Sequence, residues 1–400
     1  MNAYTVKKEL SSEKVLVAED MILTADMPTT AGSKMLGGYM SLFEAEVLTR
    51  LRGAGYAVCG KADVGEFAID LLGETSVRGA IVEDGKIKNA SAMIVENGDA
   101  EAAICLDVNG SVRRAAAMSG LVSIKPTYGT VSRFGTIPVA CSGETVSVLA
   151  RSADKCKEIL AVMAGHDDKD GTSLCEELCA KLVDGADTKP LRKVALLRDL
   201  ANKGKDDVRA KLDEAVSALK ESGVEVVEID NDMIACARAA WNVLMCAELC
   251  NNVSRYDGVK YGYRAESFSG IDELYTNSRT EAFGDLLKTA IIFGSETLST
   301  ENYMKVYDKC LRTRRVISEE FGKLFCEYDA VMMPAASATA YTEAQITENK
   351  HLAFEENIYT APASITGLPA VVAGGVQLVG CAFSELTLLE GAKIITKEGR

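Results

Sequence analysis

The stretch that decides the fold class runs from Lys193 to Glu228. It reads KVALL at 193–197, DDVRAKLDEAVSALKES at 206–222, Gly223, and VEVVE at 224–228. The first and last segments are apolar and short, as strands are, whereas the middle segment has the charged pattern of a surface helix. A strand, a helix and a second strand in this order form a parallel crossover unit. The segment therefore predicts an α/β fold.

Other elements can be predicted on either side of this unit. Ser41–Arg52 places Leu42, Ala45, Leu48 and Leu51 on one helical stripe, with glycines following as stop signals. The further expectations are a short strand at Tyr56–Cys59, a mostly helical region from Asp232 to Phe325 that is broken at Arg255–Phe268, and a last strand at Ala330–Met333 that ends at Pro334.

The composition excludes several classes of protein. A chain of 400 residues with 48% hydrophobic and 26% charged residues can bury a large core, so neither disorder nor a fibrous repeat fits. The net charge of −14 argues against nucleic acid or an acidic membrane surface as the main partner. Apolar runs such as Ala330–Pro334 are far shorter than the roughly 20 residues of a membrane span. The N-terminal residues contain no hydrophobic signal core, so we expect a cytoplasmic protein.

The cysteines and histidines limit the possible chemistry. The 12 cysteines show neither a CxxC pair nor the regular spacing of a secreted scaffold, so we expect reduced and mostly buried thiols. With only two histidines, His166 and His351, a triad that uses histidine as its base is not expected. Any catalysis must use another base.

One local pattern resembles a phosphate-binding loop. Gly55, Gly60 and Lys61 have the spacing of that motif, whose backbone amides and lysine hold phosphates. However, Ala62 provides no hydroxyl group for Mg²⁺, and the residues between the glycines form an apolar strand rather than a loop that leads into a helix. The pattern indicates structure rather than nucleotide binding.

Two further patterns resemble metal sites. Cys246 and Cys250 lie four residues apart on an expected helix, but no additional Cys or His nearby completes a ligand set, so buried packing explains them better. Asp167, Asp168 and Asp170 resemble the start of a calcium loop without its downstream Glu, which favours a solvated turn. We therefore expect no metal and no cofactor.

Six longer strings are specific when they are taken together. They are PTTAGSKML at Pro28–Leu36, GKADVGEFA at Gly60–Ala68, SIKPTYGTVSRFG at Ser123–Gly135, AGHDDKD at Ala164–Asp170, SRYDGVKYGYRAE at Ser254–Glu266 and SRTEAFGD at Ser278–Asp285. In this collinear order the chain resembles the amidase signature family, and within it the A subunits of the glutamyl-tRNA(Gln) and aspartyl-tRNA(Asn) amidotransferases.

The resemblance implies a fold and an activity. The expected fold is a central mixed sheet of about eleven strands with helices on both faces, in a single domain over residues 1–400 that lacks the family's N-terminal helical stretch and part of its C-terminal region. The family hydrolyses amides with a Ser-cisSer-Lys triad, and the A subunit releases ammonia from glutamine for the amidation of tRNA-bound Glu or Asp. In such a triad a neutral Lys, relayed through the bridging Ser, removes the proton of the nucleophilic Ser.

The resemblance also implies partners. The B and C subunits of the amidotransferase, or an intact copy of its A subunit, are the expected protein partners, although the missing N-terminal stretch weakens the case for the C subunit. A small amide or amino acid is the expected ligand. ATP, Mg²⁺ and tRNA belong to the B subunit in that family, so we expect no direct contact with nucleic acid.

Two of the three triad positions have changed. Where the family has Lys in a string like VAVKDNI, this chain has Glu19 in LVAEDMI. The bridging Ser of the family's GGSSGGSA string is replaced by Ile87 in GKIKNASA. A carboxylate cannot replace the Lys in reach or charge, and Ile cannot relay a proton. Without a catalytic reason for a cis peptide, we expect a trans bond at Ile87.

The nucleophile position is retained as Ser111 in DVNGSVRRAA. The backbone amides of Val108, Asn109 and Gly110 correspond to the oxyanion hole of the family. Ser111 has a plainer interpretation as the N-cap of a helix. Lys86 and Lys88 flank the lost bridging position and are candidates for a substitute base, although solvated loop charges explain them better.

The expected substrate contacts are half retained. Arg279, in SRTEAFGD, corresponds to the Arg that contacts the carboxylate of glutamine, and Asn357, in NIYTAP, replaces the acidic partner of its amino group. Arg279 has the alternative role of pairing with a nearby carboxylate. The string at Cys141–Val148, which borders the active site in the family, has also changed.

Two hypotheses follow. The first is an amidase-like protein without glutaminase activity that acts as a binding or regulatory partner, because strings such as Ser254–Glu266 are kept while the triad is lost. The second is an active amide hydrolase, or an amidotransferase A subunit, that works through Ser111 and an unrecognised base. Hydrogen bonding between Ser111 and Lys86 or Lys88 would favour the second.

Overall fold

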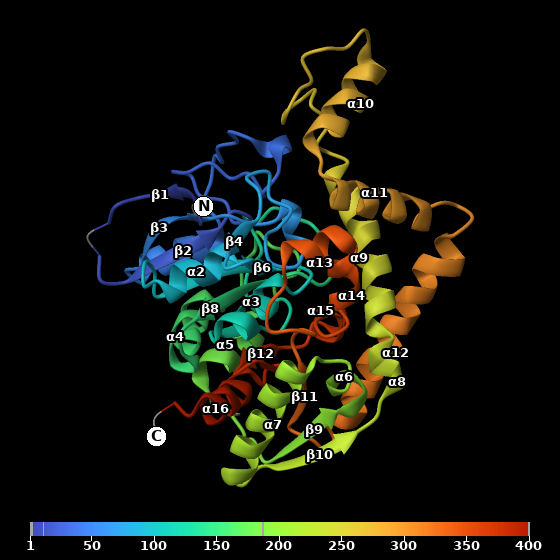
Figure 1. The fold of residues 1–400 in the computed structure, drawn as a ribbon. Coiled ribbons are helices and arrows are strands. Elements are labelled where there is room, and N and C mark those ends of the chain that lie inside the picture. The colour runs from blue at the N-terminus through green and yellow to red at the C-terminus, as the bar shows by residue number, and fades with distance from the viewer. Residues whose placement is uncertain (1–2, 11, 186–187, 399–400) are drawn as a thin grey trace.

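The computed structural model describes residues 3–10, 12–185 and 188–398. Its centre is a mixed sheet of 11 strands, as the resemblance implies (Figure 1). In spatial order the strands are β1 (Tyr4–Lys7), β3 (Ala57–Ala62), β2 (Val15–Glu19), β6 (Ala102–Asp107), β8 (Thr145–Ala150), β7 (Val122–Lys125), β12 (Ala370–Ala373), β13 (Val376–Gly380), β11 (Ala330–Pro334), β9 (Lys193–Leu197) and β10 (Glu225–Ile229). A separate hairpin is formed by β4 (Ile81–Glu83) and β5 (Lys86–Lys88).

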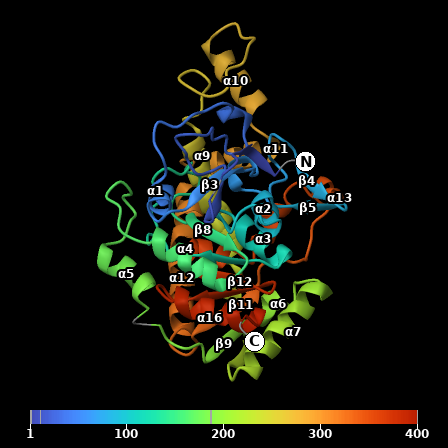
Figure 2. The ribbon, with the colours of Figure 1, turned by 90° about the vertical axis from the view of Figure 1, so that its left-hand side faces the viewer.

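Helices cover both faces of the sheet (Figures 1 and 2). In chain order they are η1 (Lys34–Leu36), α1 (Glu46–Gly53), η2 (Glu66–Ala68), α2 (Ala90–Glu96), α3 (Ser111–Ser119), α4 (Ala153–Met163), α5 (Glu176–Asp184), α6 (Arg198–Ala201), α7 (Asp206–Glu221), α8 (Asp232–Ala235), α9 (Ala237–Val253), α10 (Ile271–Ala282), α11 (Asp285–Thr297), η3 (Tyr303–Tyr307), α12 (Asp308–Leu324), α13 (Glu343–Glu348), α14 (Leu352–Glu356), α15 (Ala361–Thr366) and α16 (Glu385–Thr396).

The predicted crossover unit is confirmed. Strands β9 and β10 pair in parallel and α7 connects them, so the α/β class is correct. The helical region and its break before α10 are also confirmed. That the whole chain forms a single domain stays a prediction.

Two local predictions are wrong. The helix expected from Ser41 begins only at Glu46, and Leu42 is 97% exposed, because Ala45 has extended backbone angles and ends the regular stripe. The strand at Ala330–Pro334 is not the last one, since β12 and β13 follow it and pair in antiparallel register. These two strands are short and fully buried, so they show no alternation of polar and apolar residues.

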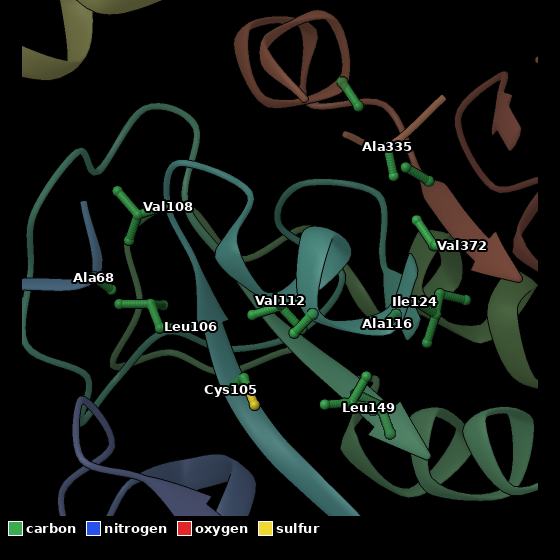
Figure 3. Close-up of a cluster of buried hydrophobic side chains, with 14 of the residues drawn as sticks. Ala68, Cys105, Leu106, Val108, Val112, Ala116, Ile124, Leu149, Ala335 and Val372 are labelled. Carbon is green, nitrogen blue, oxygen red and sulfur yellow. The ribbon is translucent and has the colours of Figure 1, made fainter. Parts of the chain in front are cut away.

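A buried apolar cluster fixes α3 against the sheet (Figure 3). Val112 and Ala116 of α3 lie among side chains from four neighbouring strands: Cys105 and Leu106 of β6, Leu149 of β8, Ile124 of β7 and Val372 of β12. Because α3 begins with Ser111, this packing also fixes the position of the retained serine.

One apolar stretch has a length that invites a comparison with membrane helices. Asp232–Val253 has 22 residues and a mean hydropathy of 1.3, enough by length and composition to cross a membrane. However, 56% of its apolar window is buried inside the protein, where α9 packs against α11 and α12. Such burial is typical of a core helix, so the stretch is weak evidence for a span.

A buried ion pair connects the two halves of the chain beside α3. All five N–H donors of Arg113 are used, in two bonds to the carboxylate of Asp107 at 2.8 and 2.9 Å and in bonds to Thr360 O, Ser364 Oγ and Gln377 Oε1 at 2.7–2.9 Å. Burial alone would raise the pKa of Asp107, but the charge of Arg113 and its hydrogen bonds hold that pKa below its usual value. The pair is fully satisfied and fully buried.

We expect Asp107→Ala to lower the free energy of unfolding by about 3–5 kcal/mol, because the substitution leaves the Arg113 charge buried without a partner. Urea denaturation measures the change. The control is Arg315→Ala, which removes an exposed pair with Glu319 and should change stability by less than about 0.5 kcal/mol. An equal effect of the two substitutions would show that the buried pair does not organise this region.

Candidate functional site

Ser111 lies at the turn between β6 and α3. Gly110 caps the helix with a left-handed φ of +86°, and a Cβ at this position would meet Thr360 Cβ at 2.4 Å. Only glycine therefore fits both the backbone conformation and the space. The turn brings Val108, Asn109 and Gly110 directly before the serine, in the places expected for an oxyanion hole.

The side chain of Ser111 has no hydrogen-bonding partner. It is 3% exposed, and its Oγ bonds to no other described group. The N-cap interpretation is wrong, because Gly110 occupies the N-cap position and Ser111 is the first helical residue. The same observation places neither Lys86 nor Lys88 in hydrogen-bonding contact with Ser111. Lys86 is exposed, and Lys88 Nζ lies 3.6 Å from Glu83 on the small hairpin.

Glu19 lies at the end of β2, the strand that pairs directly with β6. Its Oε2 accepts a hydrogen bond from Leu106 N at 2.9 Å. Burial raises the pKa of Glu19 to about 8, only partly offset by that bond. The side chain is therefore mostly a neutral carboxylic acid at pH 7. It offers neither the positive charge nor the proton-accepting amine of a lysine.

Ile87 fills the bridging position with a buried apolar side chain. It lies at the centre of β5, its side chain is 3% exposed, and its N–H donates to Tyr341 O at 2.8 Å. All peptide bonds among the described residues are trans, as expected for Ile87. The Ile87 side chain itself provides no hydroxyl group for a proton relay, and its place in the triad stays a prediction.

Asn109 and Asn357 form a buried chain of amides with a third residue, Asn242 of α9. Asn357 Nδ2 donates to Asn109 Oδ1 at 2.9 Å and to Asn242 Oδ1 at 2.6 Å. Asn109 Nδ2 in turn donates to Ile69 O at 2.8 Å. The sequence analysis missed Asn242, because nothing in its local sequence distinguishes it from any other polar residue on a helix.

Arg279 makes internal contacts instead of an ion pair. Its Nη1 donates to the backbone oxygens of Val253 and Tyr256 at 3.2 and 3.0 Å, and its guanidinium group lies 5.0 Å from the Phe283 ring centre. The suggested pairing with a carboxylate is wrong for the described residues, since none of their carboxylates reaches Arg279. These bonds stabilise the chain where it leaves α9, before α10 begins.

Two buried lysines also lie in this region. Lys61 belongs to the pattern that resembles a phosphate-binding loop, and it lies on β3, so the interpretation of that pattern as a strand is confirmed. Its Nζ donates to Thr29 Oγ1 at 2.9 Å and lies 3.6 Å from Asp20 Oδ1. Burial lowers its pKa to about 8. Lys125 donates to Leu368 O at 3.1 Å, and burial lowers its pKa to about 7. Both amines are enclosed by these partners, so they have structural roles.

The other candidate ligand sites have structural partners. Within the described residues, no three His, Cys, Asp or Glu side chains come together as a metal site. Asp167 and Asp170 accept hydrogen bonds from Ser132 Oγ and Thr172 Oγ1 in a loop, and Cys246 is buried in α9. These residues act in packing and turn formation.

Comparisons with known proteins identify the family and the fold. The family model described as Amidase matches residues 16–389. The A subunit of glutamyl-tRNA(Gln) amidotransferase from Acinetobacter baumannii is 36% identical over 395 residues, which is 94% of this chain and 80% of that protein. The protein of the same name from Symbiobacterium thermophilum is 33% identical over 392 residues, with the same coverage.

Solved structures show the same fold. The crystal structure of the glutamyl-tRNA(Gln) amidotransferase A subunit from Thermotoga maritima has a TM-score of 0.82 and 26% identity, and covers 99% of this chain and 87% of that one. Urea amidolyase of K. lactis has a TM-score of 0.81 and 22% identity, and covers 96% of this chain and 23% of that one. The second likeness concerns the fold alone.

The raised pKa of Glu19 predicts a pH dependence of stability. Because the folded state binds its proton more tightly than the unfolded state, Glu19 contributes stability below pH about 4.5 that is lost as the pH rises to about 8. Glu19→Gln keeps the uncharged shape without the titration. Between pH 5 and pH 8, wild type should lose up to about 1.4 kcal/mol per pH unit more than Glu19→Gln in urea denaturation. The exposed Glu319→Gln is the control, and parallel pH profiles of wild type and Glu19→Gln would contradict a neutral Glu19.

Proposed function

Because this chain belongs to the amidase family, we propose that it is a catalytically inactive relative of the glutamine-hydrolysing A subunit, with a role as a binding or regulatory partner. The single observation that carries the proposal is the state of Ser111: its Oγ is buried and has no hydrogen-bonding partner. A serine hydroxyl is a weak nucleophile until a neighbouring base removes its proton. Among the residues that the structure describes, no base hydrogen-bonds to Ser111, which supports the proposal.

The electrostatics of the former lysine position support the same conclusion. Glu19 with a pKa of about 8 carries a proton at pH 7, so it is a hydrogen-bond donor where the reaction needs an acceptor. At higher pH it would become a buried negative charge at the position where the family has a positive one. That charge would oppose the oxyanion that forms during amide hydrolysis.

The contacts expected for an amino-acid substrate are also engaged internally. Arg279 donates to backbone oxygens, and the Nδ2 group of Asn357 is shared between Asn109 and Asn242. A neutral amide cannot replace the acidic group that pairs with an ammonium. A free amino acid would have to displace these bonds, so affinity for glutamine should be weak.

The partners that we propose come from the relatives. The curated relatives are named as subunits of glutamyl-tRNA(Gln) amidotransferase, and this chain shares most of their length. The B and C subunits of that enzyme, or an intact A subunit, are therefore the proteins to test first, in the cytoplasm. Catalysis would reside in the partner, and this chain would modulate its assembly or activity.

The direct test is ammonia release from glutamine, asparagine and a simple aliphatic amide, by the purified chain alone and with the B and C subunits. We expect no release above that of Ser111→Ala, because Ser111 has no base. The A subunit from Thermotoga maritima serves as the positive control for the assay. Activity that Ser111→Ala abolishes would instead establish an active amide hydrolase, and the search for its base would begin with Lys86 and Lys88.

A further inference from the structure

Two of the strings that carry the family resemblance, Pro28–Leu36 and Ser254–Glu266, contact each other on the surface. The backbone N–H of Tyr263, in Ser254–Glu266, donates to Met35 O at 2.8 Å, and Lys34 Nζ lies 3.9 Å from the Tyr263 ring centre. Gly262 packs so closely that an added Cβ would lie 2.8 Å from Met35 Sδ. Figures 1 and 2 show the arm, residues 254–282 with α10, projecting beyond the blue N-terminal part of the chain. Neither string contains a triad position.

A groove with a volume of about 580 Å³ lies between these two strings. Its floor is apolar, formed by Leu23, Leu36, Ile137 and Tyr256, all of them buried. Its rim carries exposed aromatic side chains, with Tyr39 at 38% and Tyr261 at 47% exposure. An apolar floor with an aromatic rim is the usual construction of a recognition groove for a peptide or a partner protein.

Four cationic residues lie in or next to the segments that form the groove, and one of them, Arg255, lines it, although the chain carries a net charge of −14. Lys34, Arg255, Lys260 and Arg264 belong to the two strings, and none of the four forms an ion pair within the part of the chain that the structure describes. Lys260 is exposed, and Arg264 lies 5.5 Å from the Phe268 ring centre.

Two acidic groups of the neighbouring chain have hydrogen-bonding partners of their own and form no ion pair with these cations within the described residues, while Arg255 donates to Asn252 O and Oδ1 at 2.8 and 3.0 Å. Asp257 Oδ1 accepts the backbone N–H groups of Val259 and Lys260 at 2.8 and 3.1 Å, and Glu281 accepts the hydroxyl group of Tyr263. No carboxylate is among the described residues that line the groove.

We propose that this groove is the docking site for an acidic segment of a partner protein, one that inserts a large apolar or aromatic side chain between Tyr39 and Tyr261. The apolar floor accepts that side chain, and the four cations pair with the carboxylates that flank it. Nucleic acid is the weaker candidate, because the charge of the whole chain repels a polyanion. The proposal rests on the proposed function, since it names the surface through which a non-catalytic partner would act.

The test uses a defined probe, a fluorescein-labelled peptide of about twelve residues that is acidic except for a central Phe-Leu pair. Fluorescence anisotropy with the full chain should show saturable binding that weakens as salt is added. Lys260→Glu and Tyr261→Ser should each weaken it at least about tenfold. Both side chains are exposed, so thermal unfolding should show folded variants.

Matched controls come from η3, where Tyr303 is 43% exposed and Lys305 is exposed as well. Tyr303→Ser and Lys305→Glu make the same chemical changes outside the groove and should leave binding unchanged. A second peptide replaces Phe-Leu by Gly-Ser, and a third replaces the acidic residues by Lys. Both should bind at least about tenfold more weakly than the first.

Each remaining outcome overturns the proposal. Absence of binding by the first peptide, equal binding by the lysine peptide, or equal losses in the groove and control variants would each refute the site. Equal binding by the Gly-Ser peptide would refute the apolar anchor and leave a simple anion site. Ammonia release separates the two hypotheses: activity with peptide binding would refute the proposed function but keep the groove, and inactivity without binding would do the reverse.

Discussion

The structure around Ser111 depends on the buried pair of Asp107 and Arg113. Arg113 reaches from the N-terminal half of the chain to Thr360 O, Ser364 Oγ and Gln377 Oε1, so one guanidinium group joins β6 and α3 to α15 and β13. Removing either charge would leave the other buried and unpaired, which costs far more than the pair gains. The turn that presents Ser111 is therefore held by the requirements of folding, whether or not the serine reacts.

The proposed loss of the triad is compatible with this framework. Glu19 stands where the family has a lysine, and a buried charged carboxylate would cost free energy of folding. Burial raises the pKa of this carboxyl group to about 8, so the group is mostly neutral at pH 7, and Leu106 N donates a hydrogen bond to it. Ile87 removes a second polar group from the same interior and adds apolar packing. Both side chains are buried, and neither is among the hydrogen-bonding partners of Arg113.

Sequence reasoning succeeded where a residue's role follows from its neighbours in the chain. The crossover unit at 193–228 and the family could be predicted, because a local pattern and collinear strings carry that information. Three features of the site could not be predicted: the acceptors of Arg279, the amide chain from Asn109 to Asn242, and the Oγ of Ser111 without a partner among the described residues. They depend on contacts between residues that are distant in the chain or on the direction of a side chain. The late strands β12 and β13 were missed because both faces of each are buried, which removes the alternating pattern of a surface strand.

Arg279 is the residue expected to contact the substrate, and it also stabilises the chain that forms the groove. The resemblance assigns this arginine to the carboxylate of glutamine, whereas here its donors hold the backbone oxygens of Val253 and Tyr256 at the base of the arm. Tyr256 also packs against Phe67, with ring centres 5.5 Å apart, and forms part of the groove floor. Arg279 thus orders the chain that forms the groove, whether or not it also contacts a ligand. Selection on the surface alone would then preserve Arg279, and its presence is no evidence for glutamine binding.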